Sequence, residues 1–134
     1  MPVLHLDHVN IPTARLAESI SFYRDVLGLS LGPSPMAQDM SAGAWAFDER
    51  GIAVVHLSGT RSESAAADPV RGVAQRGVID HFALRYDELD SVHSAIEDRG
   101  LPFEMFDAPQ LGMRLLFVRD PNGVMVELSA PLHE

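Results

Sequence analysis

Residues 6–11 read Leu-Asp-His-Val-Asn-Ile, and residues 79–84 repeat the pattern as Ile-Asp-His-Phe-Ala-Leu. A second pair of segments matches in the same way: residues 54–58 read Val-Val-His-Leu-Ser, and residues 125–129 read Met-Val-Glu-Leu-Ser. Two half-chains that fold alike would bring four side chains to equivalent places around a pseudo-twofold axis, namely His8, His56, His81 and Glu127. Three imidazoles and one carboxylate indicate a divalent-metal site, and therefore an enzyme.

Composition limits the classes of protein to which the chain can belong. Its 134 residues, 46% of them hydrophobic, fit one globular domain. With no cysteine, any metal must be held by His, Asp or Glu. A formal net charge of −9 argues against nucleic-acid or anionic-membrane partners. No apolar run approaches the roughly 20 residues of a membrane span, and no signal peptide is visible, so we expect a cytoplasmic protein.

The first half predicts the order β-α-β-β-β. Residues 4–11 alternate like a strand, and Thr13 is placed to cap a helix. Gly28 is placed to end that helix in a left-handed conformation. The helix would bury one stripe, made of Leu16, Ile20, Tyr23 and Leu27. A short strand and loop over residues 29–43 and a hairpin of residues 44–47 and 52–57 complete the half.

The second half repeats this order after a linker at residues 59–77. We expect a strand at 78–85, a helix at 88–99 that buries Leu89, Val92 and Ile96 and ends at Gly100, a strand at 102–106 and a hairpin of 113–119 and 124–129. Gly51 precedes His56 by five residues, whereas Gly123 precedes Glu127 by four. We therefore expect the two hairpin turns to differ by one residue.

Half of this chain is too small to bury its own sheet, so the two halves should fold together. The prediction is an α+β fold of two tandem βαβββ modules, about 3–58 and 78–130, within a single domain covering 1–134. They would form a curved mixed sheet, with helices on the outer face and a cup on the other. Strand alternation places all four candidate ligands on the cup face.

The chain resembles the vicinal-oxygen-chelate superfamily, which includes glyoxalases, bleomycin resistance proteins and extradiol dioxygenases. The resemblance is carried by residues 6–9, by Ser-Phe-Tyr-Arg-Asp-Val-Leu-Gly at 21–28, by residues 79–83 and by Phe-Val-Arg-Asp-Pro-Asn-Gly at 117–123 through Glu127. It implies that His8, His81 and Glu127 bind a divalent ion that chelates a substrate through two vicinal oxygens. Zn, Ni, Mn, Co and Fe all accept these ligands.

His56 occupies the position at which members of this superfamily differ. By resemblance it is either a fourth metal ligand or a general acid/base, and the sequence leaves both open. Extradiol enzymes have a Tyr where this chain has Phe117, and a His where it has residues 108–110, Ala-Pro-Gln. Thiol-transferring fosfomycin-resistance proteins have a Thr where this chain has Asn10. Both departures weaken those interpretations.

The walls of the cup would be mainly apolar, and Arg85 is the cation best placed to hold a substrate carboxylate. Expected substrate contacts are Asn10, Trp45, Phe47, Arg85, Leu115 and Phe117. We therefore expect a small, partly apolar substrate that is aromatic or anionic.

Three functions remain open: a glyoxalase-like lyase, isomerase or epimerase, an extradiol-type ring-cleaving dioxygenase, and a metal-free ligand-binding protein of the bleomycin-resistance kind. The resemblance favours a homodimer with two sites. The sequence leaves open whether each site forms within one chain or across swapped halves.

Overall fold

The computed structural model describes residues 1–60 and 77–133. The chain divides into two compact units, unit 1 (Met1–Asp68) and unit 2 (Pro69–Glu134). Both repeat one βαβββ order, so the predicted α+β fold of paired modules is confirmed. Most of the predicted linker at residues 59–77 lies outside the described residues.

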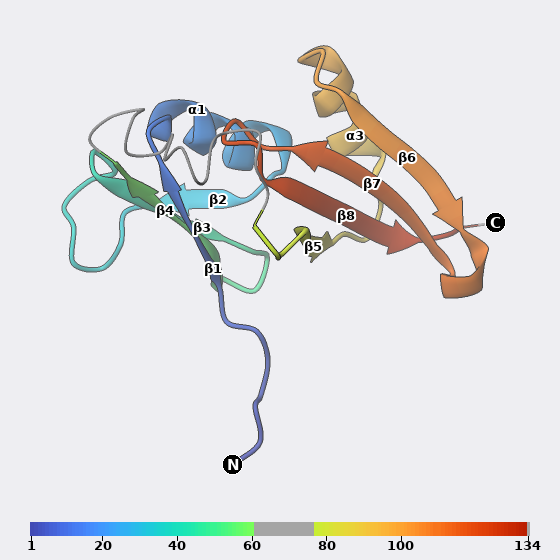
Figure 1. Ribbon diagram of the computed structural model, residues 1–134, viewed down its shortest axis with the longest axis horizontal. Coiled ribbons are helices and arrows are strands. Elements are labelled where there is room, and N and C mark those ends of the chain that lie inside the picture. Colours follow the sequence, from blue (N-terminus) through green and yellow to red (C-terminus); the bar gives the residue numbers. More distant parts are fainter. Residues whose placement is uncertain (61–76, 134) are drawn as a thin grey trace. The chain divides into compact units, whose positions relative to one another are not determined.

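Over residues 1–60, unit 1 has a four-stranded mixed sheet and the helical segment that begins at Leu16. Its strands are ordered β1-β4-β3-β2 (Figure 1). β1 runs parallel to β4, and the other neighbours are antiparallel. The elements are β1 (Val9–Thr13), α1 (Leu16–Ser21) continued by the π-helix η1 (Phe22–Val26), β2 (Ser30–Gly32), β3 (Gly43–Phe47) and β4 (Ala53–Gly59).

Unit 2 repeats this topology. Its sheet has the order β5-β8-β7-β6, with β5 parallel to β8 and the remaining neighbours antiparallel. The elements are β5 (His81–Arg85), α3 (Asp90–Asp98), β6 (Phe103–Ala108), the short 3-10 helix η2 (Pro109–Leu111), β7 (Met113–Arg119) and β8 (Met125–Pro131).

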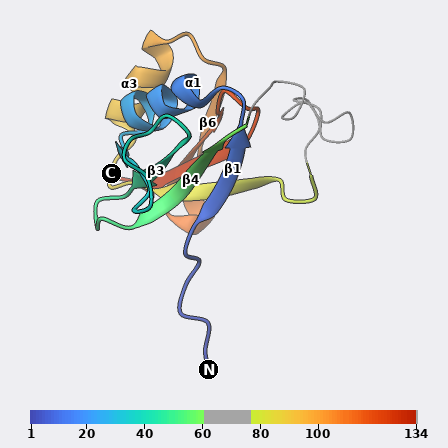
Figure 2. The same cartoon turned by 90° about the vertical axis from the view of Figure 1, so that its left-hand side faces the viewer.

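The core of each unit is made by its helix and by alternate residues of its strands. In unit 1 these include Tyr23, Val55 and Leu57, and in unit 2 Leu116, Val126 and Leu128. The predicted inward positions of the second helix are all buried: Leu89, Val92 and Ile96. Figure 2 shows α1 lying to one side of the strands β1, β3 and β4. No helix in the described part of the chain is long and apolar enough to cross a membrane.

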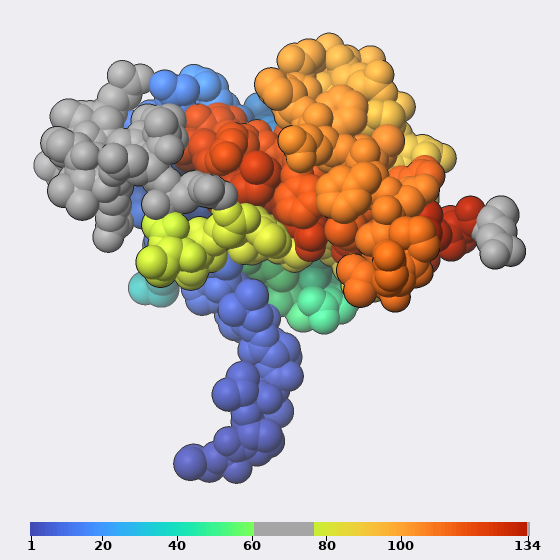
Figure 3. All heavy atoms as spheres, turned by 45° about the vertical axis from the view of Figure 1, so that its right-hand side comes forward, coloured from blue at the N-terminus to red at the C-terminus, as the bar shows by residue number. Residues whose placement is uncertain are grey.

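The first strand of each half begins later than predicted. β1 begins at Val9 and not at residue 4, and β5 begins at His81 and not at residue 78. Their parallel partners begin only at Ala53 and Met125, directly after the hairpin turns. In unit 2 His81 pairs with Met125, the first residue of β8, so earlier residues have no strand with which to pair. In unit 1 Val9 pairs with Val55, two residues into β4. Residues 1–8 are extended and exposed, as the blue segment of Figure 3 shows.

The predicted start of the first helix is wrong. Thr13 ends β1, and the helix cap is Arg15, which makes no side-chain capping hydrogen bond. The Thr13 Oγ1 atom instead accepts a hydrogen bond from the Arg15 backbone N–H at 2.8 Å. The Thr13 hydroxyl thus accepts a hydrogen bond from a backbone N–H group in the loop between β1 and α1, and the helix begins at Leu16.

The predicted buried stripe of this helix is only partly correct. Tyr23 and Leu27 are buried, but Leu16 and Ile20 are half-buried, and Phe22 and Val26 join the core. The π-helix after Ser21 explains the change, because its wider turn rotates the buried face. Gly28 ends the segment with φ of +83°, as predicted.

The two hairpin turns match, so the expected difference between them is wrong. In the first turn the Gly51 N–H donates to the Asp48 carbonyl at 2.9 Å, and in the second the Gly123 N–H donates to the Asp120 carbonyl at 3.0 Å. Both aspartates also accept side-chain hydrogen bonds from backbone N–H groups of their turns. The extra residue must therefore lie in a strand.

That residue is a β-bulge in β4. Ala46 faces Val55 across the β3–β4 ladder, but the next residue, Phe47, faces Ala53. Val54 is left over, directly before the stretch that carries His56. Bulges bend a strand and redirect nearby side chains. The two halves thus differ at the strand that carries His56.

Gly43→Ala is expected to destabilise the protein by about 1–3 kcal/mol. A Cβ at Gly43 would lie 2.7 Å from the Leu57 carbonyl oxygen, so the backbone of the β3–β4 pair would have to move. Urea unfolding measures the loss. Gly77→Ala is the matched control, because nothing lies within 4 Å of its added Cβ. Equal effects of the two substitutions would contradict the prediction.

Candidate functional site

The predicted site residues lie on the sheet face turned away from each unit's core, here called the open face. In β4, for example, Val55 and Leu57 are buried and His56 points to the opposite side. The open face of unit 1 carries His8, Asn10, Trp45, Phe47 and His56, and that of unit 2 carries His81, Arg85, Leu115, Phe117 and Glu127.

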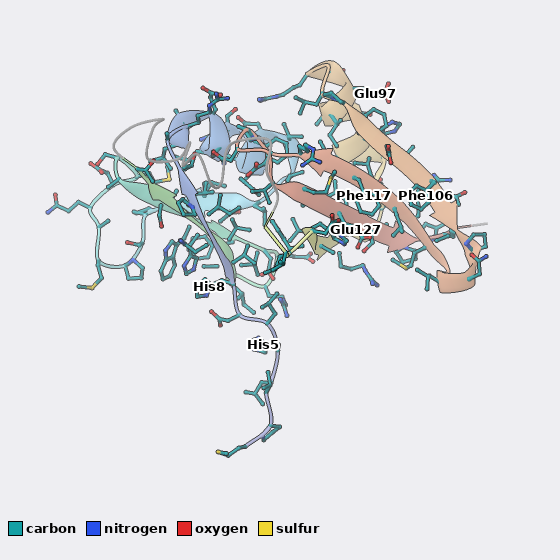
Figure 4. The ribbon with its side chains drawn as sticks, in the orientation of Figure 1. His5, His8, Glu97, Phe106, Phe117 and Glu127 are labelled. Atoms are coloured by element: carbon teal, nitrogen blue, oxygen red, sulfur yellow. The ribbon has the colours of Figure 1, made fainter. Side chains whose placement is uncertain are left out.

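In unit 1 the His56 ring stacks on two neighbouring rings. Its ring centroid lies 3.8 Å from that of His8, with 14° between the planes. It also lies 4.2 Å from that of Trp45, with 5° between the planes. The strand order β1-β4-β3 explains the contacts, because β4 lies between the other two strands. His8, labelled in Figure 4, lies just before β1.

This stacking limits which imidazole can bind a given ion. A metal bound to histidine lies about 2.0–2.1 Å from the nitrogen, in the direction of its in-plane lone pair. Rings in van der Waals contact have planes about 3.5 Å apart. An ion bound in the plane of the His8 ring therefore lies too far from the plane of the His56 ring to be bound by His56 as well. In this arrangement only one of the two rings can bind the ion.

Unit 2 brings His81 and Glu127 together. The His81 Nε2 atom lies 4.0 Å from the Glu127 Oε1 atom. Two ligands of one ion, each about 2.1 Å from it, can be at most about 4.2 Å apart. A tetrahedral ion with bonds of that length holds its ligands about 3.4 Å apart, so the two side chains must approach slightly to share one ion. The Phe117 ring lies edge-on to the His81 ring, with centroids 5.5 Å apart.

Each first histidine is held by the aspartate before it. The Asp7 Oδ2 atom lies 2.6 Å from His8 Nδ1, and the Asp80 Oδ2 atom lies 2.8 Å from His81 Nδ1. The hydrogen bond to His8 is the main cause that lowers the pKa of Asp7. A carboxylate on Nδ1 orients the ring and leaves Nε2 for a metal. No role was predicted for these aspartates, although the repeated Asp-His dipeptide was the signal.

Two of the predicted substrate contacts, Asn10 and Arg85, make polar contacts at one end of each open face. The Ser58 Oγ–H donates to Asn10 Oδ1 at 2.7 Å, and the Arg85 Nε–H donates to Ser129 Oγ at 3.1 Å. Both bonds link the parallel strands β1 and β4, or β5 and β8. Arg85 is exposed, and within residues 1–60 and 77–133 it makes no ion pair.

The predicted ligands are divided equally between the units, with His8 and His56 in unit 1 and His81 and Glu127 in unit 2. Within the described residues, no group of three or more His, Asp or Glu side chains is close enough to hold an ion. Each unit supplies a pair.

Comparison with known proteins identifies the family. Residues 5–128 match the Glyoxalase/Bleomycin resistance protein/Dioxygenase superfamily. The chain belongs to this superfamily. The match covers both units and all four candidate ligands.

Further proteins are similar to this chain in sequence or in fold. The chain is 26% identical over 125 residues to Glyoxylase I 4 of Arabidopsis thaliana, covering 92% of this chain and 68% of the relative. Its fold is similar to that of a lactoylglutathione lyase from Agrobacterium tumefaciens, with TM-score 0.64, 22% identity and coverage of 96% and 95%. It is also similar to the fosfomycin resistance protein FosX from Listeria monocytogenes, with TM-score 0.68, 15% identity and coverage of 98% and 96%.

Asp80→Asn is expected to weaken divalent-ion binding by about 10–100-fold, because an amide holds the His81 ring less firmly and makes it a weaker donor. Calorimetric titration of the chelator-treated protein with Zn²⁺ or Ni²⁺ measures the change. Asp87→Asn, on an exposed residue beyond β5, is the matched control and should bind the ion like the unsubstituted protein. An unchanged affinity in Asp80→Asn would contradict the role of this aspartate.

His56 is expected to titrate below 6.5 in the metal-free protein. Burial is the main cause that lowers its pKa, and the neighbouring His8 adds to it. The unfolded chain binds this proton more readily, so the folded state loses stability as the pH falls below about 6.5. Imidazole proton resonances followed against pH give the value. In His8→Ala it should move back toward 6.5, and a midpoint above 6.5 before substitution would contradict the prediction.

Proposed function

We propose that this protein is a divalent-metal-dependent, glyoxalase-like enzyme of the lyase, isomerase or epimerase type. His8, His81 and Glu127 would hold the ion, and His56 would move a proton. The observation that carries the proposal is the repeated Asp–His pair, in which His8 and His81 each have a carboxylate on Nδ1. A lone histidine would not favour a metal in this way, but two repeat-related pairs do.

The residues present fit a divalent ion. His81 and Glu127 are within reach of one ion, and the carboxylates of Asp7 and Asp80 orient both first histidines. When bound, the ion would polarise two vicinal oxygens of the substrate and stabilise negative charge that develops there. Its identity stays open, because Zn, Ni, Mn, Co and Fe all accept imidazole and carboxylate.

The stacking of His56 supports a role as base and not as ligand. Its ring cannot share an ion with His8 while the two are stacked. A neutral imidazole has one unprotonated ring nitrogen that can accept a proton. The lowered pKa keeps it neutral at pH 7. His56 can therefore take a proton from a carbon beside a substrate carbonyl and return it to the neighbouring atom, with no oxidant needed.

The two alternatives have less support. Ring cleavage of the extradiol type is disfavoured because Phe117, which lies against His81, has no hydroxyl group. A metal-free binding protein would have no need of the paired aspartates. The presence of both Asp–His pairs thus favours the enzyme.

Metal uptake and turnover test the proposal together. Chelator-treated protein is offered Zn²⁺, Ni²⁺, Mn²⁺, Co²⁺ and Fe²⁺ in turn, and metal content is measured after desalting. Each loaded form is then assayed for lactoylglutathione formation and for incorporation of solvent deuterium into small 2-oxo compounds. Failure to take up any of these ions would sink the proposal. Oxygen consumption with catechols in the Fe²⁺ form would instead support the dioxygenase alternative.

The proposed assembly is a homodimer with two sites. Since unit 1 carries His8 and unit 2 carries His81 and Glu127, the set could be completed within one chain or by the halves of two chains. Sedimentation of the purified protein with and without metal measures the assembly. A monomer that binds one ion per chain would contradict it.

A further inference from the structure

The open face of unit 2 has an aromatic end and a cationic end. Cross-strand pairing aligns four residues in one row: Phe106 on β6, Leu115 on β7, Ser129 on β8 and Arg85 on β5. Opposed residues of a sheet share a face, and neighbouring strands lie about 4.8 Å apart. The row therefore runs from an aromatic ring to a guanidinium on one surface.

The aromatic end is a partly exposed stack. The Phe106 and Phe117 rings have centroids 5.9 Å apart and planes 14° apart, and Figure 4 labels both on neighbouring strands. Phe106 remains 48% exposed. Phe106 lies on β6, an edge strand of the unit 2 sheet, so part of its ring faces solvent. A further ring can stack against it at low cost.

The cationic end is Arg85, which makes no ion pair with a carboxylate among the described residues. Arg24, Arg50 and Arg114 each pair with a carboxylate. Arg85, in contrast, donates only to the neutral Ser129 hydroxyl among the described residues. That bond places the guanidinium over β8 and leaves its outer N–H groups for a bidentate anion. Because the chain has a net charge of −9, most of its surface repels anions, and Arg85 is a position at which an anionic ligand can bind.

We propose that this row is the substrate subsite, and that it takes a small aryl carboxylate whose ring lies on Phe106 and Phe117 and whose carboxylate pairs with Arg85. The hydrogen bond to Ser129 draws the guanidinium over β8, two strand intervals or about 10 Å from Phe106 on β6. That span suits an acid one or two carbons from its ring once the length of the ion pair is added. This assignment rests on the proposed function only in calling the bound acid a substrate. Glu127 lies on β8 two residues before Ser129, so the bound acid would lie beside the metal-binding pair.

The test is binding of phenylacetate and its neutral isostere phenylacetamide to chelator-treated, full-length protein, measured by calorimetry or by chemical-shift changes. We expect the acid to bind at least about tenfold more tightly than the amide. Arg85→Gln should abolish that difference. Phe106→Leu should weaken both ligands by roughly threefold and keep the difference. Arg114→Gln is the matched control, because Arg114 pairs with Asp107 and alternates to the opposite side of β7.

Three results would overturn the subsite. The acid and the amide could bind equally, which would make the occupant a neutral aromatic compound. Arg85→Gln could keep the preference for the acid. The acid could bind only after metal loading, which would place its carboxylate on the ion. Metal uptake measured on the same sample separates the proposed subsite from the proposed enzyme function. Acid-selective binding without metal uptake would support the subsite and contradict the metal-dependent enzyme.

Discussion

His81→Ala is expected to weaken binding of a divalent ion by more than about 100-fold, whereas His56→Ala should change it by less than about threefold. Removing an outer partner of a metal-binding histidine already costs about 10–100-fold, so removing the histidine must cost more. His56 is stacked on His8 with nearly parallel planes and cannot share its ion. Calorimetric titration of chelator-treated protein with Zn²⁺ or Ni²⁺ measures both affinities.

The same pair of variants separates the two roles of histidine. His93→Ala is the control for a general effect of histidine loss, because His93 on α3 pairs with Glu97 at 2.8 Å. In the metal-loaded protein, His56→Ala should lose solvent deuterium exchange while it keeps its ion. A large loss of affinity in His56→Ala would make His56 a ligand, and the stacked arrangement would then have to open when the ion binds.

Leu116→Ala is expected to lower the free energy of unfolding by about 2–5 kcal/mol. Leu116 is fully buried in β7, between β6 and β8, and its truncation leaves a cavity that the central strands cannot close. Urea unfolding followed by circular dichroism gives the difference. Leu111→Ala makes the same chemical change at a residue that is 68% exposed and should cost less than about 0.5 kcal/mol. Similar losses in both variants would contradict the assignment of the core.

Much of the fold was predictable because the chain repeats itself. The matching Asp-His segments and the matching hairpin strands predict two βαβββ modules, and alternation predicts which side of each strand is buried. Both hold: Val55 and Val126 are buried, and their neighbours His56 and Glu127 lie on the open faces. Residue-by-residue patterns of this kind depend only on local geometry.

The errors have non-local causes. The start of β5 depends on where its parallel partner begins, which residues 78–80 do not themselves encode. The extra residue before His56 could have been in the turn or in the strand, and only the pairing of Phe47 with Ala53 assigns it to a bulge. The side chain of Thr13 was expected at the helix cap because its hydrogen-bonding partner, Arg15, was not known.

The candidate site was predictable in composition and less so in arrangement. The repeat alone predicts the four candidate ligands, and their binding of a metal stays a prediction. The stack of His8, His56 and Trp45 needed the strand order, because it joins residues from three different strands. Phe106 was not predicted as a substrate contact, because β6 lies outside the segments that match between the two halves.

Trp45 is the only tryptophan of the chain, and its ring lies flat against His56. All indole emission from the protein therefore originates beside the proposed base. An excited indole loses its energy to a protonated imidazole in contact with it much more readily than to a neutral one. The protein thus carries its own optical probe, and its ultraviolet fluorescence reports the protonation of His56 without any label.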